Sequence, residues 1–197
     1  MSVETPAVLK KATLQDLARV PGKAELIGGR IVHFMPTGFL PNRIAAVIFM
    51  SLENHTRAVG RGVSLTDNVA FAVPELPSGR ESFSPDAAYY DGPLPQNVMD
   101  FIPGPPTFAV EVRSKGDYGN AAEAEMAAKR ADYFLAGTKA VWDVDPIARR
   151  IHLYRADAPD RPITFQPGQM ADAEPAVPGW RMAVDEIFVA PAWPGHA

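Results

Sequence analysis

Apolar and polar positions recur along the chain with two periods, and these periods predict where helices and strands lie. Over residues 41–59 the apolar residues return every three or four positions, which is typical of an amphipathic helix. A second helix is predicted over residues 121–136, where alanine is abundant and Gly137 follows as a helix-ending residue. A third, short helix is predicted after Thr13, whose hydroxyl can cap it together with the side chain of Asp16.

Several shorter apolar runs predict strands. Residues 25–35 predict a tight hairpin around Gly28-Gly29, and residues 141–154 predict another around Pro146. Stretches rich in proline, glycine and serine predict loops over residues 74–85 and 92–106. The remaining predicted strands cover residues 63–65, 69–73, 87–90 and 107–113, and a last short strand or helix covers residues 182–189. This order is typical of a mixed α/β protein, in which helices pack against one sheet.

Length and composition place the chain among single-domain globular proteins. It has 197 residues, of which 47% are hydrophobic and 21% are charged. We expect one domain over residues 13–189, an N-terminal extension over residues 1–12 and a loose tail over residues 190–197. No apolar stretch approaches the roughly 20 residues that span a bilayer, and the first residues lack the pattern of a signal peptide. We therefore expect a soluble, cytoplasmic protein with no membrane partner.

Charge and cysteine content limit the chemistry. The absence of cysteine excludes disulfides and thiolate metal sites, and the four histidines lack the paired spacing of a histidine metal site. A formal net charge of -4 disfavours indiscriminate coating of nucleic acid, which needs a broadly basic surface. It does not exclude a metal-dependent nuclease, because bound cations neutralise a cluster of carboxylates.

Glu111 stands out because it interrupts an apolar, strand-like run. Alternation along a strand places Glu111 and Arg113 on one face and Val110 and Val112 on the other. A buried carboxylate requires a metal ion, a cationic side chain or a proton. A second carboxylate, Asp86, opens a neighbouring predicted strand. Two such carboxylates suit Mg²⁺ or Mn²⁺ and thus hydrolysis of a phosphodiester, whereas spacing alone favours a simple Glu111–Arg113 ion pair at a sheet surface.

Short motifs in a fixed order strengthen the first interpretation. Pro85-Asp86, followed after a proline-rich loop by Glu111-Val112-Arg113, resembles the PD-(D/E)XK nuclease signature. From about Thr13 to Tyr154 the chain resembles the Uma2 (Uma-two) family of restriction-endonuclease-like proteins. That resemblance implies a restriction-endonuclease-like fold, a Mg²⁺-type site and endonuclease activity on DNA. The motifs that carry it are residues 25–31, Pro85-Asp86, residues 111–114, Lys129, Tyr133, Gly137 and residues 142–146.

The resemblance also implies roles for individual residues. Asp86 and Glu111 fall on the acidic metal-ligand positions. Glu25 falls on an acidic position that often reaches the metal or its waters, the alternative being a solvated hairpin residue. The signature lysine is replaced by Arg113, which can clamp a phosphate but does not release its proton. Lys129, on the following helix, is the matching lysine and the preferred cation over Arg113.

Whether Lys129 reaches the site depends on which face of its helix packs on the sheet. One stripe of that helix holds Ala122, Met126, Lys129 and Tyr133. A second stripe, which the pattern favours as the core-facing one, holds Ala124, Ala127, Ala131, Phe134 and Leu135. Lys129 points at the site only if the first stripe also packs on the sheet.

Further candidate ligands and two functions other than a nuclease stay open. Asp143 and Asp145 share a strand face and are further candidate ligands, although Asp145 precedes Pro146 and is favoured as a turn residue. A non-catalytic binding or scaffold protein of the same fold would explain Arg113 and the acidic net charge, and hydrolysis of another phosphoester is a third possibility. For the nuclease, the fold implies a homodimer, because two copies of one site cut two strands.

Overall fold

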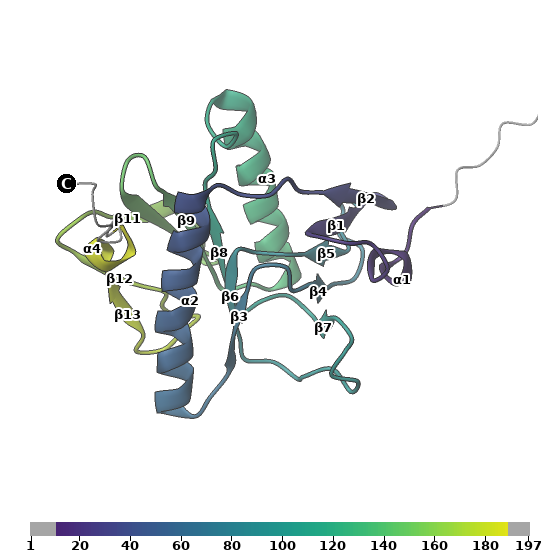
Figure 1. The fold of residues 1–197 in the computed structure, drawn as a ribbon, viewed down its shortest axis with the longest axis horizontal. Helices are drawn as coiled ribbons and strands as arrows, with labels where there is room; N and C mark the ends of the chain where they lie inside the picture. The colour runs from purple at the N-terminus through teal and green to yellow at the C-terminus, as the bar shows by residue number, and fades with distance from the viewer. Residues whose placement is uncertain (1–10, 189–197) are drawn as a thin grey trace, which may run out of the picture.

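The computed structural model describes residues 11–188, and a six-stranded mixed sheet forms its centre (Figure 1). Its strands lie in the order β11-β10-β9-β8-β6-β3. They span Val63–Thr66 (β3), Ala87–Tyr90 (β6), Phe108–Val112 (β8), Ala140–Asp145 (β9), Arg150–Arg155 (β10) and Ala158–Phe165 (β11). Strands β8 and β9 are parallel, and the helix between them, α3 (Asn120–Ala136), makes the crossover; the other neighbours are antiparallel.

Shorter elements surround this sheet. A hairpin of β1 (Ala24–Ile27) and β2 (Arg30–His33) turns at Gly28-Gly29, as the sequence predicts, and both glycines have the positive φ that this turn requires. The other elements are α1 (Leu14–Leu17), α2 (Phe39–Val59), β4 (Phe71–Ala72), β5 (Ser82–Phe83), β7 (Ile102–Pro103), β12 (Met170–Asp172), β13 (Arg181–Ala183) and α4 (Val184–Ile187). Thr13 and Asp16 form the predicted capping box of α1.

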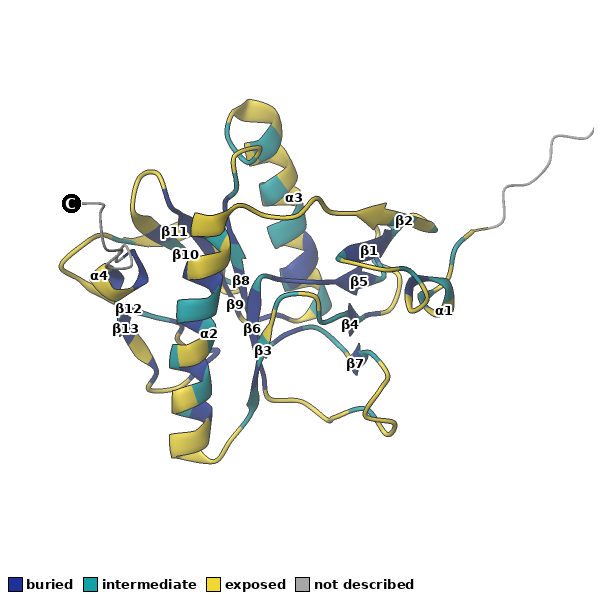
Figure 2. Ribbon diagram, viewed as in Figure 1, coloured by how far each residue is buried: buried dark blue, intermediate teal, exposed yellow. Residues whose placement is uncertain are grey.

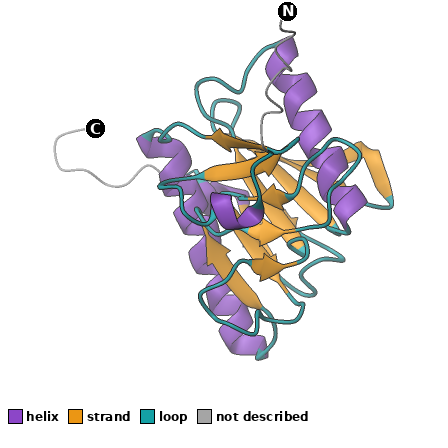
Figure 3. Cartoon of the chain, turned by 90° about the vertical axis from the view of Figure 1, so that its right-hand side faces the viewer, coloured by secondary structure: helices purple, strands orange, loops and turns teal. Residues whose placement is uncertain are grey.

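Helices α2 and α3 cover opposite faces of the sheet (Figures 1 and 3). Under α2, Ile44, Ile48 and Leu52 share one apolar cluster with Val110 and Trp142. Under α3, a second cluster holds Phe71, Phe83, Ala88, Ala109, Tyr133 and Val141. The alternation predicted for residues 107–113 is confirmed, and it turns Glu111 toward the α3 face. Figure 2 shows β6 and β8 largely buried between the two helices.

The prediction for the faces of α3 is wrong in one respect. Lys129 and Tyr133 belong to the stripe that packs on the sheet, where Tyr133 is fully buried. In the other stripe Ala124, Ala127, Ala131 and Leu135 are exposed and only Phe134 is partly buried. Alanine is small enough to be tolerated on either face of a helix, so its abundance does not mark the core-facing side.

Several segments differ from the predictions. Strands β5 and β7 lie within stretches predicted as loops, and β11 and β12 fall where no element is predicted. Strand β11 is an edge strand with a mostly exposed surface, and it contains Pro159 and Pro162. Apart from Lys11 and Ala12, the predicted extension and tail lie outside the described residues, and the single domain over residues 13–189 stays a prediction. No helix in residues 11–188 is long and apolar enough to cross a membrane.

Candidate functional site

Asp86 and Glu111 lie side by side at one end of the pair β6–β8. Ala87 is the partner of Val110 across this pair, so the residue before Ala87 and the residue after Val110 lie at the same end. The backbone fixes Asp86 there, because its N–H donates to the Val110 carbonyl (3.0 Å) and its Oδ2 accepts the N–H of Val112 (2.7 Å). Both carboxylates line a cavity of about 730 Å³.

Helix α3 supplies two groups that bind Glu111. The Lys129 ammonium lies 2.8 Å from Glu111 Oε1, and the Tyr133 hydroxyl donates to the same oxygen at 2.6 Å. Because Lys129 and Tyr133 are four residues apart, they project from the same side of the helix. Lys129 also lies 3.1 Å from Glu25 Oε1, so this one ammonium bridges two carboxylates.

Glu25 comes from the hairpin and is completely buried, so the alternative of a solvated hairpin residue is wrong. Its carboxylate accepts the N–H of Ser84 at 2.9 Å and a short hydrogen bond from Arg80 Nη1. Arg80 in turn donates through Nε to Asp132 at 2.9 Å. The hairpin, the segment before β5 and helix α3 are thereby joined by buried ion pairs around the candidate site.

Asp86 has a cationic partner that the sequence analysis missed. The Lys23 ammonium lies 2.6 Å from Asp86 Oδ1 and 2.8 Å from Asp67 Oδ1. A signal for Lys23 exists in the sequence, because alternate positions of an extended segment share a face and Lys23 stands two residues before Glu25. No comparable signal marks Arg80, which belongs to a stretch predicted as a loop.

Arg113 belongs to a separate ionic cluster, so a simple Glu111–Arg113 pair is the wrong interpretation. Its guanidinium donates two hydrogen bonds to Asp143, at 2.7 and 2.8 Å, and contacts Glu123 on α3. Arg130 donates to the same Asp143 at 3.2 Å. Asp145 is a turn residue as predicted, because its Oδ1 accepts the N–H groups of residues 147 and 148.

The electrostatic balance around Glu111 favours an additional cation. Burial, and then the negative charges of Asp86 and Glu25, raise the pKa of Glu111 above 4.5 although Lys129 and Lys23 oppose the shift. Burial works to lower the pKa of Lys129, but Glu111 and Glu25 outweigh it and the pKa is raised. The cavity lining contains eight carboxylates and five cationic side chains. Negative charge therefore remains in excess there.

The residues fit a divalent cation in their chemistry. Mg²⁺ is usually bound through one or two carboxylates together with waters and substrate oxygens, not by an all-protein cage. Asp86 and Glu111 are two such carboxylates, and the Glu111 contacts with Lys129 and Tyr133 both reach Oε1. Within residues 11–188, no group of three or more acidic or histidine side chains is arranged to hold a metal ion. A two-carboxylate site that also uses water or substrate oxygens satisfies both observations.

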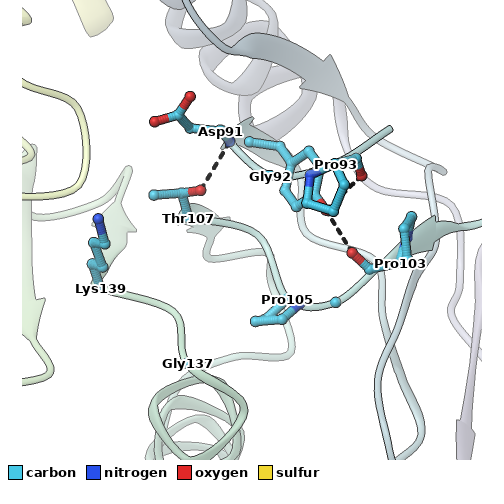
Figure 4. Close-up of a pocket in the computed structure, with 10 residues that line it drawn as sticks. Asp91, Gly92, Pro93, Pro103, Pro105, Thr107, Gly137 and Lys139 are labelled. Carbon is cyan, nitrogen blue, oxygen red and sulfur yellow. Dashed lines mark hydrogen bonds between the residues drawn. The ribbon is translucent and has the colours of Figure 1, made fainter. Parts of the chain in front are cut away.

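A second cavity, of about 280 Å³, lies at the opposite end of β6 and β8 (Figure 4). Its lining includes Asp91, Thr107 and Lys139, and the backbone N–H of Asp91 donates to the Thr107 hydroxyl at 3.0 Å. Asp91 is the one carboxylate in this lining, and Arg61 binds it at 2.8 Å. This cavity lacks the paired acids of the larger one, so the larger cavity is the candidate site.

Comparisons with known proteins agree with the fold. The model of the Uma2 family, described as "Putative restriction endonuclease", matches residues 13–185. A crystal structure from Anabaena variabilis ATCC 29413, of a "putative nuclease belonging to DUF820", superposes with a TM-score of 0.67 at 17% sequence identity. The match covers 89% of this chain and 97% of that chain, whereas no curated protein matches in sequence. The predicted restriction-endonuclease-like α/β fold is thus confirmed, and the chain belongs to the Uma2 family.

Proposed function

We propose that the chain is a metal-dependent endonuclease that hydrolyses phosphodiester bonds in DNA. The observation that carries this proposal is the convergence of Asp86, Glu111 and Lys129 in one cavity on a restriction-endonuclease-like fold. The family description and the name of the Anabaena variabilis protein support the same activity. A cytoplasmic homodimer, with one site for each strand of DNA, belongs to the proposal.

Asp86 and Glu111 are the residues that would hold Mg²⁺ or Mn²⁺. A bound divalent cation would supply Lewis acidity and make a bound water more acidic. The hydrogen bond from the Val112 N–H fixes the Asp86 carboxylate, and the Tyr133 hydroxyl fixes that of Glu111. Both acids are therefore oriented before any ligand arrives, which reduces the ordering that binding requires.

Lys129 is the cation that we assign to the reacting phosphate. Hydrolysis forms a bond from the water oxygen to phosphorus and breaks the bond from phosphorus to the leaving sugar oxygen, which takes up a proton. The ammonium of Lys129 lies against Glu111 and can stabilise the negative charge that develops on the phosphate oxygens. Glu25 positions Lys129 from the other side. Arg113 is less suited to this role, because Asp143 and Glu123 already bind its guanidinium.

Plasmid nicking with matched variants tests the proposal. In Mg²⁺ or Mn²⁺ the wild-type protein should nick supercoiled plasmid, and Asp86→Asn and Glu111→Gln should abolish the nicking. Lys129→Met should slow it by about 100-fold, the usual effect of removing a group that stabilises transition-state charge. Lys139→Met, which removes a lysine that lines the remote cavity, is the matched control and should cut at the wild-type rate.

The same ion pairs favour one alternative, a non-catalytic binding or scaffold protein. Lys23 and Lys129 pair with Asp86 and Glu111, so each acid has a cationic partner within the protein and can serve a structural role. Calorimetric titration with Mn²⁺ separates the two functions. Heat of binding that disappears in Asp86→Asn supports the enzyme, whereas neither binding nor nicking indicates the scaffold. Turnover of a small phosphodiester without any cutting of DNA would indicate a different phosphoester substrate.

A further inference from the structure

Lys23 pairs with the Asp86 oxygen that the backbone N–H of Val112 leaves free. Its ammonium lies 2.6 Å from Asp86 Oδ1, and the side chain is only 17% exposed. The other oxygen of Asp86 already accepts the Val112 N–H. Mg²⁺ binds carboxylate oxygens at about 2.0–2.1 Å, which would bring it close to the Lys23 ammonium and into strong mutual repulsion. A metal ion at Asp86 would therefore compete with Lys23 for this carboxylate.

Asp67 offers Lys23 a second place to bind. Its Oδ1 lies 2.8 Å from the Lys23 ammonium and also accepts the N–H of Asn68 at 2.8 Å. Asn68 has a φ of 68°, a conformation typical of a tight turn, so the turn itself orients the Asp67 carboxylate. Asp67 is more exposed than Asp86, with 39% of its side chain accessible against 19%. A flexible lysine stem can keep its bond to Asp67 while its bond to Asp86 breaks.

Lys23 differs in this respect from Lys129, the other ammonium of the site. The two partners of Lys129 are Glu111 and the fully buried Glu25, which Arg80 also binds. Lys129 is thus held inside the protein on both sides. Lys23 bridges one inner and one outer carboxylate, and its bond to the inner one is the exchangeable contact.

We propose that Lys23 is an internal counter-ion that competes with the divalent cation for Asp86 and is retained by Asp67 when the metal binds. This inference rests on the proposed function, because it requires a metal ion at Asp86 and Glu111. Lys23 keeps Asp86 neutralised and ordered in the metal-free protein. Because the metal must displace Lys23 from Asp86, the affinity of the protein for metal is lowered. The protein should therefore bind the divalent cation only where that cation is abundant.

A double-mutant cycle measured by Mn²⁺ calorimetry tests the inference. Lys23→Met should tighten Mn²⁺ binding by about tenfold or more, because a competing positive charge near the metal has gone. Asp67→Asn should weaken binding in the wild-type background, where Lys23 then depends on Asp86 alone. In the Lys23→Met background, Asp67→Asn should weaken binding less, through the loss of its charge alone. Lys139→Met is the control and should bind Mn²⁺ as the wild type does.

Each other outcome overturns the inference in a distinguishable way. If the wild type binds Mn²⁺ and Lys23→Met binds it no more tightly, the competition is refuted and the proposed nuclease stands. If Asp67→Asn weakens Mn²⁺ binding equally in the wild-type and Lys23→Met backgrounds, its effect is that of its charge alone, and Asp67 does not retain Lys23 when the metal binds. If no variant binds Mn²⁺, the metal site and the competition both fail.

A second measurement uses the wild-type protein and does not depend on the folding of any variant. Acetylation of Lys23 by a water-soluble ester, followed by mass spectrometry, should become faster when Mn²⁺ is added, because the ammonium leaves Asp86. Lys139 in the same sample gives the reference rate and should not change. A Lys23 rate that is unaffected by saturating Mn²⁺ contradicts the exchange.

Discussion

Replacing Tyr133 with phenylalanine removes one hydroxyl from the candidate site and leaves the ring in place. The ring is fully buried and stacks on Phe83 with 4.2 Å between centroids, so the substitution keeps this packing. The lost interaction is the 2.6 Å hydrogen bond to Glu111. The pKa of Tyr133 is raised well above its usual value, chiefly by burial, so the hydroxyl keeps its proton and is the donor.

The expected loss of stability follows from the charge of the acceptor. A hydrogen bond to a charged group contributes about 1.5–3 kcal/mol, and one between neutral groups about 1 kcal/mol. The Glu111 side chain is 24% exposed, so water can replace part of the bond and the lower figure of about 1.5 kcal/mol applies. In a chain of this length, that loss corresponds to a fall in Tm of about 3–6 °C.

The loss should depend on pH in a direction set by Glu111. Because the pKa of Glu111 is raised above 4.5, this group takes up a proton at higher pH than an ordinary glutamate. The charge-assisted bond is fully present above that raised pKa and weakens as the pH falls through it. Since charged hydrogen bonds are roughly twice as strong as neutral ones, the loss of stability caused by Tyr133→Phe should fall toward about half as the pH is lowered through the raised pKa of Glu111.

Urea unfolding of the wild type and of Tyr133→Phe at several pH values between 8 and 4.5 measures this loss of stability. The comparison requires that the m-values of the two proteins agree. Tyr90→Phe is the matched control, because the Tyr90 hydroxyl donates to the neutral carbonyls of Pro103 and Pro93 at 2.5 and 2.9 Å. The loss of stability caused by Tyr90→Phe should stay at about 1 kcal/mol across this pH range. A loss for Tyr133→Phe that does not change with pH would refute the reasoning.

Three further predictions concern stability. Arg80→Met should lower the free energy of unfolding by about 3–5 kcal/mol, because it leaves the nearly buried Asp132 without its cation; urea unfolding should show Arg80→Lys recovering part of this loss. Gly62→Ala should lower Tm and cost at least about 1–2 kcal/mol, because φ is +71° and the new Cβ would come within 2.3 Å of the Tyr89 ring. Burial lowers the pKa of His152, so the contribution of this side chain to stability is intact above pH 6.5 and is lost as the pH falls below that value. Urea unfolding should therefore show that His152→Gln loses less stability between pH 7 and 5 than the wild type does.

Much of the fold could be predicted from the sequence because its elements carry local signals. The glycine pair of the first hairpin, the apolar period of α2 and the alternation around Glu111 each act within a few residues. Strand β11 lacked such a signal, since its proline content and its exposed residues are atypical of a strand. The faces of α3 were misassigned because its alanines fit both sides, and only tertiary packing decides between them.

The acidic residues of the candidate site could be predicted from the sequence, but only some of its cationic residues could. Asp86 and Glu111 follow from strand positions, and the structure brings Lys129 and Glu25 to Glu111. Arg80 comes from a loop, where no period relates a residue to its partner, and the one local signal for Lys23 is its position two residues before Glu25. Their positions depend on pairings between segments more than 50 residues apart, which a local pattern does not encode.

The outer edge of β11 restricts how two copies of the chain can associate. Pro159 and Pro162 lack N–H groups, and the charged residues Asp160 and Arg161 lie between them. An incoming strand would find missing donors and would have to desolvate two charges, so the sheet resists growing into a continuous sheet across two molecules. The proposed homodimer would therefore form away from this edge, and its two cavities would be related by contacts elsewhere on the surface.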